Sequence, residues 1–202
     1  MLVQSKRSGS DTVGIAFFTI LLRNVQNEIN MDNFLSRASQ LIDQINEWVG
    51  RAVSWLTTIL VVLVCFDVIT RYFFSNTAAW IMELEWHLFA LIFLFGAGYA
   101  FKHDKHVRVD LFYAKLSPKD QALVNIIGSF LFLIPWCLLI IYWSYEYALI
   151  SYNIGETSPD PGGLPARYMI KFCVSIGMVF LLFQGISVLF KNILIYRNLG
   201  QL

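Results

Sequence analysis

The stretch that decides the fold runs from Trp80 to Asp110 and reads WIMELEWHLFALIFLFGAGYAFKHDKHVRVD. It opens with acidic residues among aromatic ones, continues as an apolar run, and closes in a basic segment. Between Leu88 and Ala100 it carries no charge. Because about 20 residues of helix cross the hydrocarbon core of a bilayer, this stretch predicts one transmembrane helix with an acidic end and a basic end.

The composition of the whole chain agrees with a membrane protein. Of its 202 residues, 57% are hydrophobic and only 14% are charged, whereas a soluble domain carries about 25% charged residues. The net charge of +1 argues against nucleic acid as a partner. The lipid bilayer is therefore the first partner that the sequence predicts.

Three further apolar stretches flank this one, so we expect an all-α integral membrane fold with four transmembrane helices between residues 51 and 195. The predicted spans are 52–74, 80–101, 122–146 and 168–190. Ser117 and Pro118 are a typical helix start, and Pro135 predicts a kink within the third span. The segment 151–167 holds three of the five prolines and predicts a loop without a regular element. Residues 191–202 are read as a short polar tail.

The region before the first span has two parts. Residues 31–50 form an amphipathic pattern that predicts a helix, lying either in the membrane interface or against a partner protein. Residues 1–30 are an uncertain N-terminal extension, interpreted either as a surface-lying segment or as an over-long gene model.

The distribution of Lys and Arg predicts the orientation. The regions before the first span, after the second and after the fourth are rich in these residues, whereas the opposite side has only Arg71, Arg167 and Lys171. By the positive-inside rule, both termini and the 102–119 segment are expected in the cytoplasm.

Charged side chains at membrane depth are costly and are therefore candidate functional residues. Asp67, Arg71, Glu83 and Glu85 all fall near the outer ends of the first two spans. We expect Arg71 to pair with Glu83 across the turn, or otherwise with Asp67 on its own helix. A structural role is favoured over a substrate or ion site, because the cluster lies at a helix end rather than at the midplane.

Other residues give weaker signals. Gln184, with Gly177 and Gly185, predicts close helix packing with an internal hydrogen bond. The three cysteines are scattered, and the histidines near residue 106 lack a metal-site spacing. The sequence therefore predicts no catalytic residue, no metal and no cofactor.

Several short motifs together resemble a known family. They are Arg71-Tyr72-Phe73-Phe74, Trp80, Glu83, Gly96, His106-Val107-Arg108-Val109-Asp110 and the later segment GETSPDPGGLPARYMIKF. Their order and spacing are similar to those of the small membrane subunit of tripartite ATP-independent periplasmic (TRAP) transporters. One departure is that the family often has two adjacent acids after the Trp, whereas Met82 precedes Glu83 here and the second acid is Glu85.

The resemblance implies a place in the bacterial inner membrane and two protein partners. A large membrane transport subunit would move an organic acid or similar solute with a sodium gradient, and a periplasmic solute-binding receptor would deliver it. This chain would scaffold the large subunit and help dock the receptor. The candidate structural or docking residues are Asp67, Arg71, Trp80, Glu83, Glu85, His106, Arg108 and Asp110. The alternative is a small membrane oxidoreductase subunit or an electron-transfer anchor.

Overall fold

The computed structural model describes residues 5–75, 78–103 and 113–199, with side chains described for Arg23 and from residue 26 onward. All regular structure within these ranges is helical. The elements are α1 (Ser5–Phe74), α2 (Ala79–Lys102), α4 (Pro118–Ile127), the π-helix η1 (Gly128–Leu133), α5 (Ile134–Asn153) and α6 (Tyr168–Leu199). Four helical stretches are long and apolar enough to cross a membrane, with α4, η1 and α5 together making the third. The predicted fold class is thereby confirmed.

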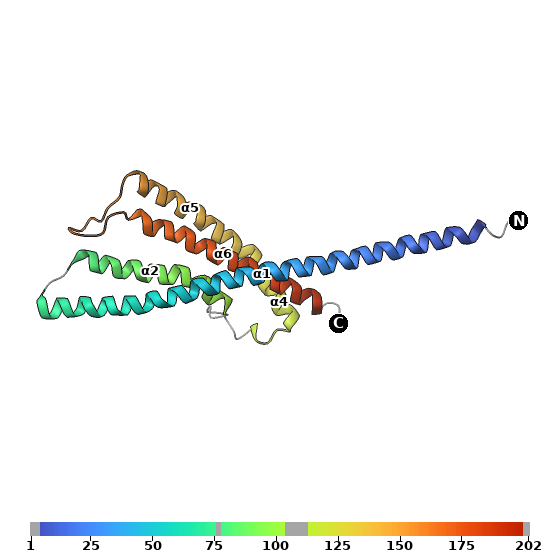
Figure 1. Ribbon diagram of the computed structural model, residues 1–202, viewed down its shortest axis with the longest axis horizontal. Coiled ribbons are helices and arrows are strands. Elements are labelled where there is room, and N and C mark those ends of the chain that lie inside the picture. Colours follow the sequence, from blue (N-terminus) through green and yellow to red (C-terminus); the bar gives the residue numbers. More distant parts are fainter. Residues whose placement is uncertain (1–4, 76–77, 104–112, 200–202) are drawn as a thin grey trace.

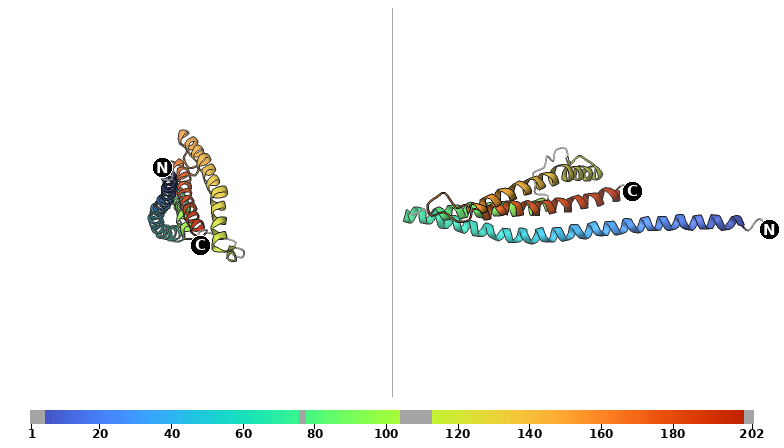
Figure 2. Two further views of the ribbon diagram at one scale, coloured as in Figure 1. Left: turned by 90° about the vertical axis from the view of Figure 1, so that its right-hand side faces the viewer. Right: turned by 90° about the horizontal axis from the view of Figure 1, so that it is seen from above.

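The helices form two antiparallel hairpins, α1 with α2 and α5 with α6 (Figure 1). Helix α6 is central, since it packs against α1, α2, α4 and α5. The α1–α2 turn and the α5–α6 loop lie at one end of the bundle, here called the hairpin end. The opposite end, here called the terminal end, holds the C-terminal parts of α2 and α6, and α1 projects far beyond it (Figures 1 and 2). Helix α2 ends there at Lys102.

Helix α1 is much longer than a bilayer is thick. Its 70 residues correspond to about 105 Å at 1.5 Å per residue, against a hydrocarbon core of about 30 Å. The amphipathic segment 31–50 is continuous with the first span and does not form a separate helix. One side of this segment packs along α6, as shown by the hydrogen bond from Ser187 Oγ to the Ser39 carbonyl at 3.2 Å.

The third span starts where the sequence indicates, and its helical geometry changes directly before Pro135. Ser117 caps α4 by accepting the Asp120 backbone N–H at 3.2 Å, and Pro118 occupies the first turn, as predicted. Helix α5 carries Pro135 in its first turn, and the six residues directly before α5 are π-helical. A proline lacks the N–H for the regular helical bond, and a local π segment is one way to satisfy the freed carbonyls.

Small residues allow the central helices to approach closely. A side chain added at Gly177 of α6 would lie 2.8 Å from Leu94 Cβ of α2. Ser175 of α6 and Ser144 of α5 share a hydrogen bond of 2.7 Å. Close contact through small residues and interhelical hydrogen bonds is typical of membrane helix packing. This packing holds the two hairpins together along α6.

Candidate functional site

The Arg71 side chain pairs within its own helix. Its guanidinium donates to Asp67 Oδ2 at 2.5 Å, one helical turn away. Asp67 is buried at 3% exposure, whereas the Arg71 side chain is 45% exposed. The expected Arg71–Glu83 pair is wrong, and the Arg71–Asp67 alternative is confirmed. The short i to i+4 spacing gives Arg71 a partner without requiring it to cross the turn.

Glu83 instead fastens the α5–α6 loop to α2. It is 4% exposed and accepts a hydrogen bond from the Leu164 backbone N–H at 2.5 Å and another from Ser158 Oγ. The Arg167 guanidinium lies 3.6 Å from the same carboxylate. Glu83 is thus a buried charge with three partners from one loop. Sequence reasoning missed this role, because the Pro-Gly composition of the loop predicts irregular backbone but not its contacts.

The loop itself has a defined backbone. Gly155, Gly162 and Ala166 adopt left-handed conformations with φ of 61°, 76° and 63°. Internal hydrogen bonds close it, among them one from the Ser158 N–H to the Leu164 carbonyl at 3.2 Å. The loop is therefore a folded element of the hairpin end.

A second charged pair supports the loop at its start. Glu156 accepts hydrogen bonds from Lys171 and from Ser151 Oγ, the latter at 2.6 Å. The Lys171 ammonium also lies 4.0 Å from the centre of the Tyr147 ring, a cation–π contact. The hydrogen bond from Lys171 is the main reason that the pKa of Glu156 is lowered from its ordinary value. The carboxylate is thus held in its charged form.

Glu85 and Trp80 have different surroundings from Glu83. Glu85 lies within electrostatic range of Asp67 and Arg71 in the α1–α2 hairpin. Its Oε1 atom is buried without a hydrogen-bond partner among the residues that the structure describes. Trp80 lies in the first turn of α2 and is 44% exposed. The two acids that the sequence left as alternatives therefore have distinct places, Glu83 under the loop and Glu85 toward α1.

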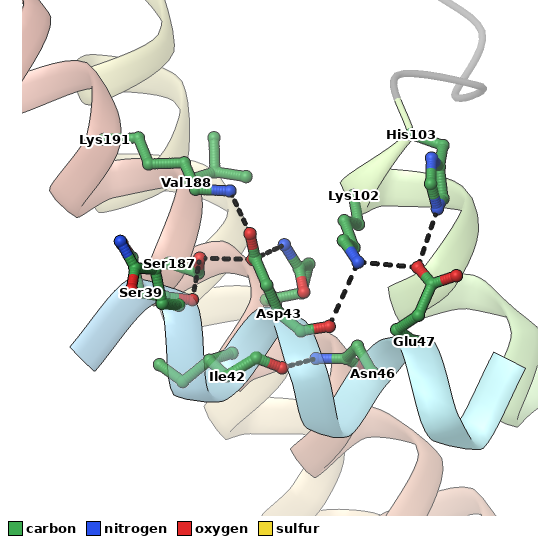
Figure 3. Close-up of polar contacts among 12 residues, drawn as sticks. Ser39, Ile42, Asp43, Asn46, Glu47, Lys102, His103, Ser187, Val188 and Lys191 are labelled. Atoms are coloured by element: carbon green, nitrogen blue, oxygen red, sulfur yellow. Dashed lines mark hydrogen bonds and ion pairs between the residues drawn. The ribbon is translucent and has the colours of Figure 1, made fainter. Parts of the chain in front are cut away.

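The terminal end holds a polar cluster that the sequence analysis did not single out (Figure 3). Asp43 of α1 accepts hydrogen bonds from Gln184 Nε2 at 3.0 Å and from Ser187 Oγ at 2.7 Å, both on α6. Lys191, one turn further along α6, also donates to Asp43. The internal hydrogen bond predicted for Gln184 is therefore confirmed, and its partner is Asp43.

The same cluster joins α1 to α2. The Lys102 ammonium donates to Glu47 Oε2 at 2.6 Å and to the Asp43 carbonyl at 3.2 Å. His103 lies 3.1 Å from the same Glu47 oxygen (Figure 3). The amphipathic pattern placed Asp43 and Glu47 on a polar face, but it did not show that this face meets basic residues of α2 and α6.

The predicted motif residues His106, Arg108 and Asp110 lie outside the described residues. Within the described part of the chain, no three His, Cys, Asp or Glu side chains group so that they could hold a metal ion. Cys65, Cys137 and Cys173 are free thiols.

The arrangement is suited to joining helices. The charged groups at the two ends pair within this chain, with residues of a neighbouring helix, of the α5–α6 loop or, for Arg71 and Asp67, of the same helix. A charge-free layer at least about 20 Å thick separates the two ends. This layer contains no Asp, Glu, Lys or Arg in residues 52–66, 88–101, 121–145 and 172–190. These features define a multi-pass helical membrane protein whose charged side chains stabilise the two ends of its bundle.

Comparison with known proteins gives the family. Residues 60–194 match the family "Tripartite ATP-independent periplasmic transporters, DctQ component". The chain therefore belongs to this family, and it is a small permease subunit of a TRAP transporter, a multi-pass protein of the inner membrane. Such a component has partner subunits, since the transporter is tripartite.

Two relatives agree with this assignment. A protein of Haemophilus influenzae named as a TRAP transporter small permease protein is 30% identical over 140 residues, which cover 64% of this chain and 86% of the relative. The C4-dicarboxylate TRAP transporter small permease protein DctQ of Vibrio cholerae is 28% identical over 144 residues. That match covers 69% of this chain and 58% of the Vibrio protein.

Proposed function

We propose that this chain scaffolds the large membrane transport subunit and helps dock the periplasmic solute receptor during sodium-driven uptake. The observation that carries the proposal is the separation of the two charged clusters by a charge-free layer. Charges that bind a solute or ion in transport lie near the bilayer midplane. Here the charged clusters lie at the ends and are paired with other groups of this chain, which suits a scaffold better than a pathway.

The hairpin end is the proposed docking side for the receptor. The positive-inside rule assigns this end to the periplasm, because the terminal end carries most of the Lys and Arg. Buried Glu83 and paired Glu156 hold the 154–167 loop in one conformation. A pre-formed loop loses less conformational entropy on binding a partner than a loose one does.

An organic acid is the proposed solute class. One relative carries C4-dicarboxylate in its name, and the resemblance of the motifs to TRAP subunits points to the same class. In this proposal the large subunit and the receptor bind the solute, and this chain supports them. The alternative of an oxidoreductase subunit or electron-transfer anchor has no such support.

The test is uptake of labelled dicarboxylate by cells that carry the large subunit and the receptor, with or without this chain. We expect sodium-dependent uptake to disappear when the chain is deleted and to return when it is supplied again. Affinity purification of the tagged chain in mild detergent should recover the large subunit. Undiminished uptake in the deletion strain would refute the scaffold role.

A further inference from the structure

Helix α1 carries two parallel stripes that differ in exposure. The inner stripe faces α2 and α6, and its buried members Ser39, Asn46, Val53 and Asp67 follow one another at multiples of seven residues. The second stripe is centred about 130° around the helix from the first, and its large side chains are exposed. One long helix thus presents an occupied face and an unoccupied one.

The exposed stripe advances alternately by three and four residues without interruption. We call it the outer seam, and it runs from Phe34 to Phe73. In the charge-free layer it consists of Ala52, Trp55, Ile59, Val62 and Phe66, and it continues toward the hairpin end with Ile69 and Phe73. The six seam side chains from Trp55 to Phe73 are at least half exposed in the chain by itself. Such a repeat averages 3.5 residues per turn, which is the pattern for packing against another helix with a left-handed crossing of about 20°.

The outer seam continues beyond the charge-free layer at the terminal end. There it consists of Phe34, Ala38, Leu41, Ile45 and Trp48. The side chains of Phe34, Leu41 and Trp48 are 67%, 61% and 74% exposed. The same stretch of α1 bears Asp43 and Glu47, which pair with the lysines of the terminal-end cluster. This part of the seam is therefore at the level of the charged groups or outside it.

Lipid tails are too short to cover the whole seam. From Phe34 to Phe73 it extends about 60 Å, twice the hydrocarbon thickness of about 30 Å. Nor does α1 turn to lie in the membrane plane, since it is one continuous helix through this region. An exposed apolar surface of this length marks a protein interface. The covering element must span the bilayer and continue past it at the terminal end.

The sizes of the seam residues favour a helix of a different protein over a second copy of this chain. Trp48, Ala52 and Trp55 form a notch with a bulky side chain on each side. In a symmetric parallel pair, Trp48 would meet Trp48 and Ala52 would meet Ala52, so that layers would be alternately overfilled and empty. A partner with large residues opposite the alanine fills the notch. Exposed Arg37 beside the seam also favours acidic residues on the partner, as does Arg51, whose side chain is 75% exposed although it pairs with Glu47.

We propose that the outer seam of α1 binds a long helix of the large membrane subunit, apolar within the bilayer and acidic at its edge beyond it. This proposal rests on the proposed function, because it takes the large subunit as the partner. It adds which face of which helix makes the contact. It also predicts that the contact continues outside the membrane at the terminal end.

Photo-crosslinking from matched neighbouring positions tests the seam. A photoreactive amino acid is placed at Val62 or at its neighbour Val61, which are 63% and 56% exposed, but only Val62 is in the seam. A second pair is Leu41 in the seam and Gln40 outside it. In membranes that contain the large subunit, we expect crosslinks to it from Val62 and Leu41, several-fold stronger than from Val61 and Gln40.

The outcomes of this experiment distinguish a failure of the seam proposal from a failure of the proposed function. Equal crosslinking from Val61 and Val62, or a crosslink between two differently tagged copies of this chain, would overturn the seam proposal. Crosslinking from Val62 but not from Leu41 would overturn its extension beyond the membrane. If the large subunit copurifies with the chain in these cases, the scaffold function stands. If it does not copurify with the unmodified chain, the proposed function itself fails.

A charge substitution gives a second readout. Leu41→Glu should lower the recovery of the large subunit with the tagged chain by about tenfold or more, since it places an unpaired charge in an apolar contact. Gln40→Glu adds the same charge outside the seam and should leave recovery unchanged. Because Leu41 is exposed in the chain by itself, the variant is expected to fold. Equal recovery of the two variants would contradict the seam.

Discussion

Glu83 Oε2 accepts the backbone N–H of Leu164 at 2.5 Å, although the two residues are 81 positions apart in the chain. The bond ties the α5–α6 loop to the α1–α2 hairpin at the hairpin end. With Glu156, the buried Glu83 carboxylate thus helps to hold the conformation of the surface that we propose for receptor docking.

Glu83→Ala should therefore loosen the loop without unfolding the bundle. The substitution removes the acceptor for the Leu164 N–H and for Ser158, and each lost partner costs about 1–3 kcal/mol if the group stays buried. Hydrogen exchange should show faster exchange at Leu164, and Glu83→Gln, which retains an acceptor oxygen, should show a smaller change. Unchanged exchange at Leu164 in Glu83→Ala would contradict the assigned role.

Arg71→Ala should lower the yield of folded chain, because it leaves the buried Asp67 carboxylate without its partner. The effect is moderated because the Arg71 side chain is half-exposed and water is near. Adding Asp67→Asn should restore part of the loss, as measured by thermal unfolding in detergent. Arg51→Ala is the control, since the Arg51–Glu47 pair has an Arg side chain that is 75% exposed. If the double variant were no more stable than Arg71→Ala, the result would argue against a stabilising Arg71–Asp67 pair.

The Glu156–Lys171 pair predicts a pH dependence of stability. The hydrogen bond from Lys171 lowers the pKa of Glu156 below its ordinary value of 4.5. Its contribution to stability is therefore complete above about pH 4.5 and is lost as the pH falls through the lower, folded-state pKa. Thermal unfolding should show the native chain more stable than Glu156→Gln at pH 7, with the difference shrinking below pH 4. If the difference in stability between the native chain and Glu156→Gln stayed constant from pH 7 to below pH 4, ionisation of Glu156 would not contribute to stability.

The orientation is testable by cysteine labelling. In a background with Cys65, Cys137 and Cys173 replaced by Ser, a membrane-impermeant maleimide should label Asp160→Cys from the periplasmic side. Lys115→Cys should react only after the membrane is opened. Both positions are exposed in the structure, so differential labelling reports the side of the membrane. Labelling of Lys115→Cys but not of Asp160→Cys in intact spheroplasts would show that the orientation is the opposite of the one expected.

The sequence predicted features that depend on local chemistry. Four long apolar stretches, the cap at Ser117 and the hydrogen bond of Gln184 each follow from a few neighbouring residues or from burial in a bilayer. The pairing of Asp67 with Arg71 also depends only on residues one helical turn apart, and the sequence offered it as the alternative to the Arg71–Glu83 pair.

Contacts between distant segments could not be predicted in this way. Glu83 was assigned to Arg71 because both lie near the α1–α2 turn, but its partners come from a loop that follows α5. Asp43 and Glu47 lie in the amphipathic segment 31–50, whose pattern predicts a helix but does not show that α1 continues unbroken along α6. Which acid meets which base depends on helix lengths and on how the two hairpins cross.

The central claim is that this chain supports transport by a partner and has no transport pathway of its own. The most direct measurement is sodium-dependent uptake of labelled dicarboxylate into liposomes, with receptor present, for the chain alone, the large subunit alone and both together. We predict uptake only when both membrane subunits are present, and a loss when the seam variant Leu41→Glu replaces the native chain. Sodium-dependent uptake by the chain alone, or full uptake by the large subunit alone, would contradict the account.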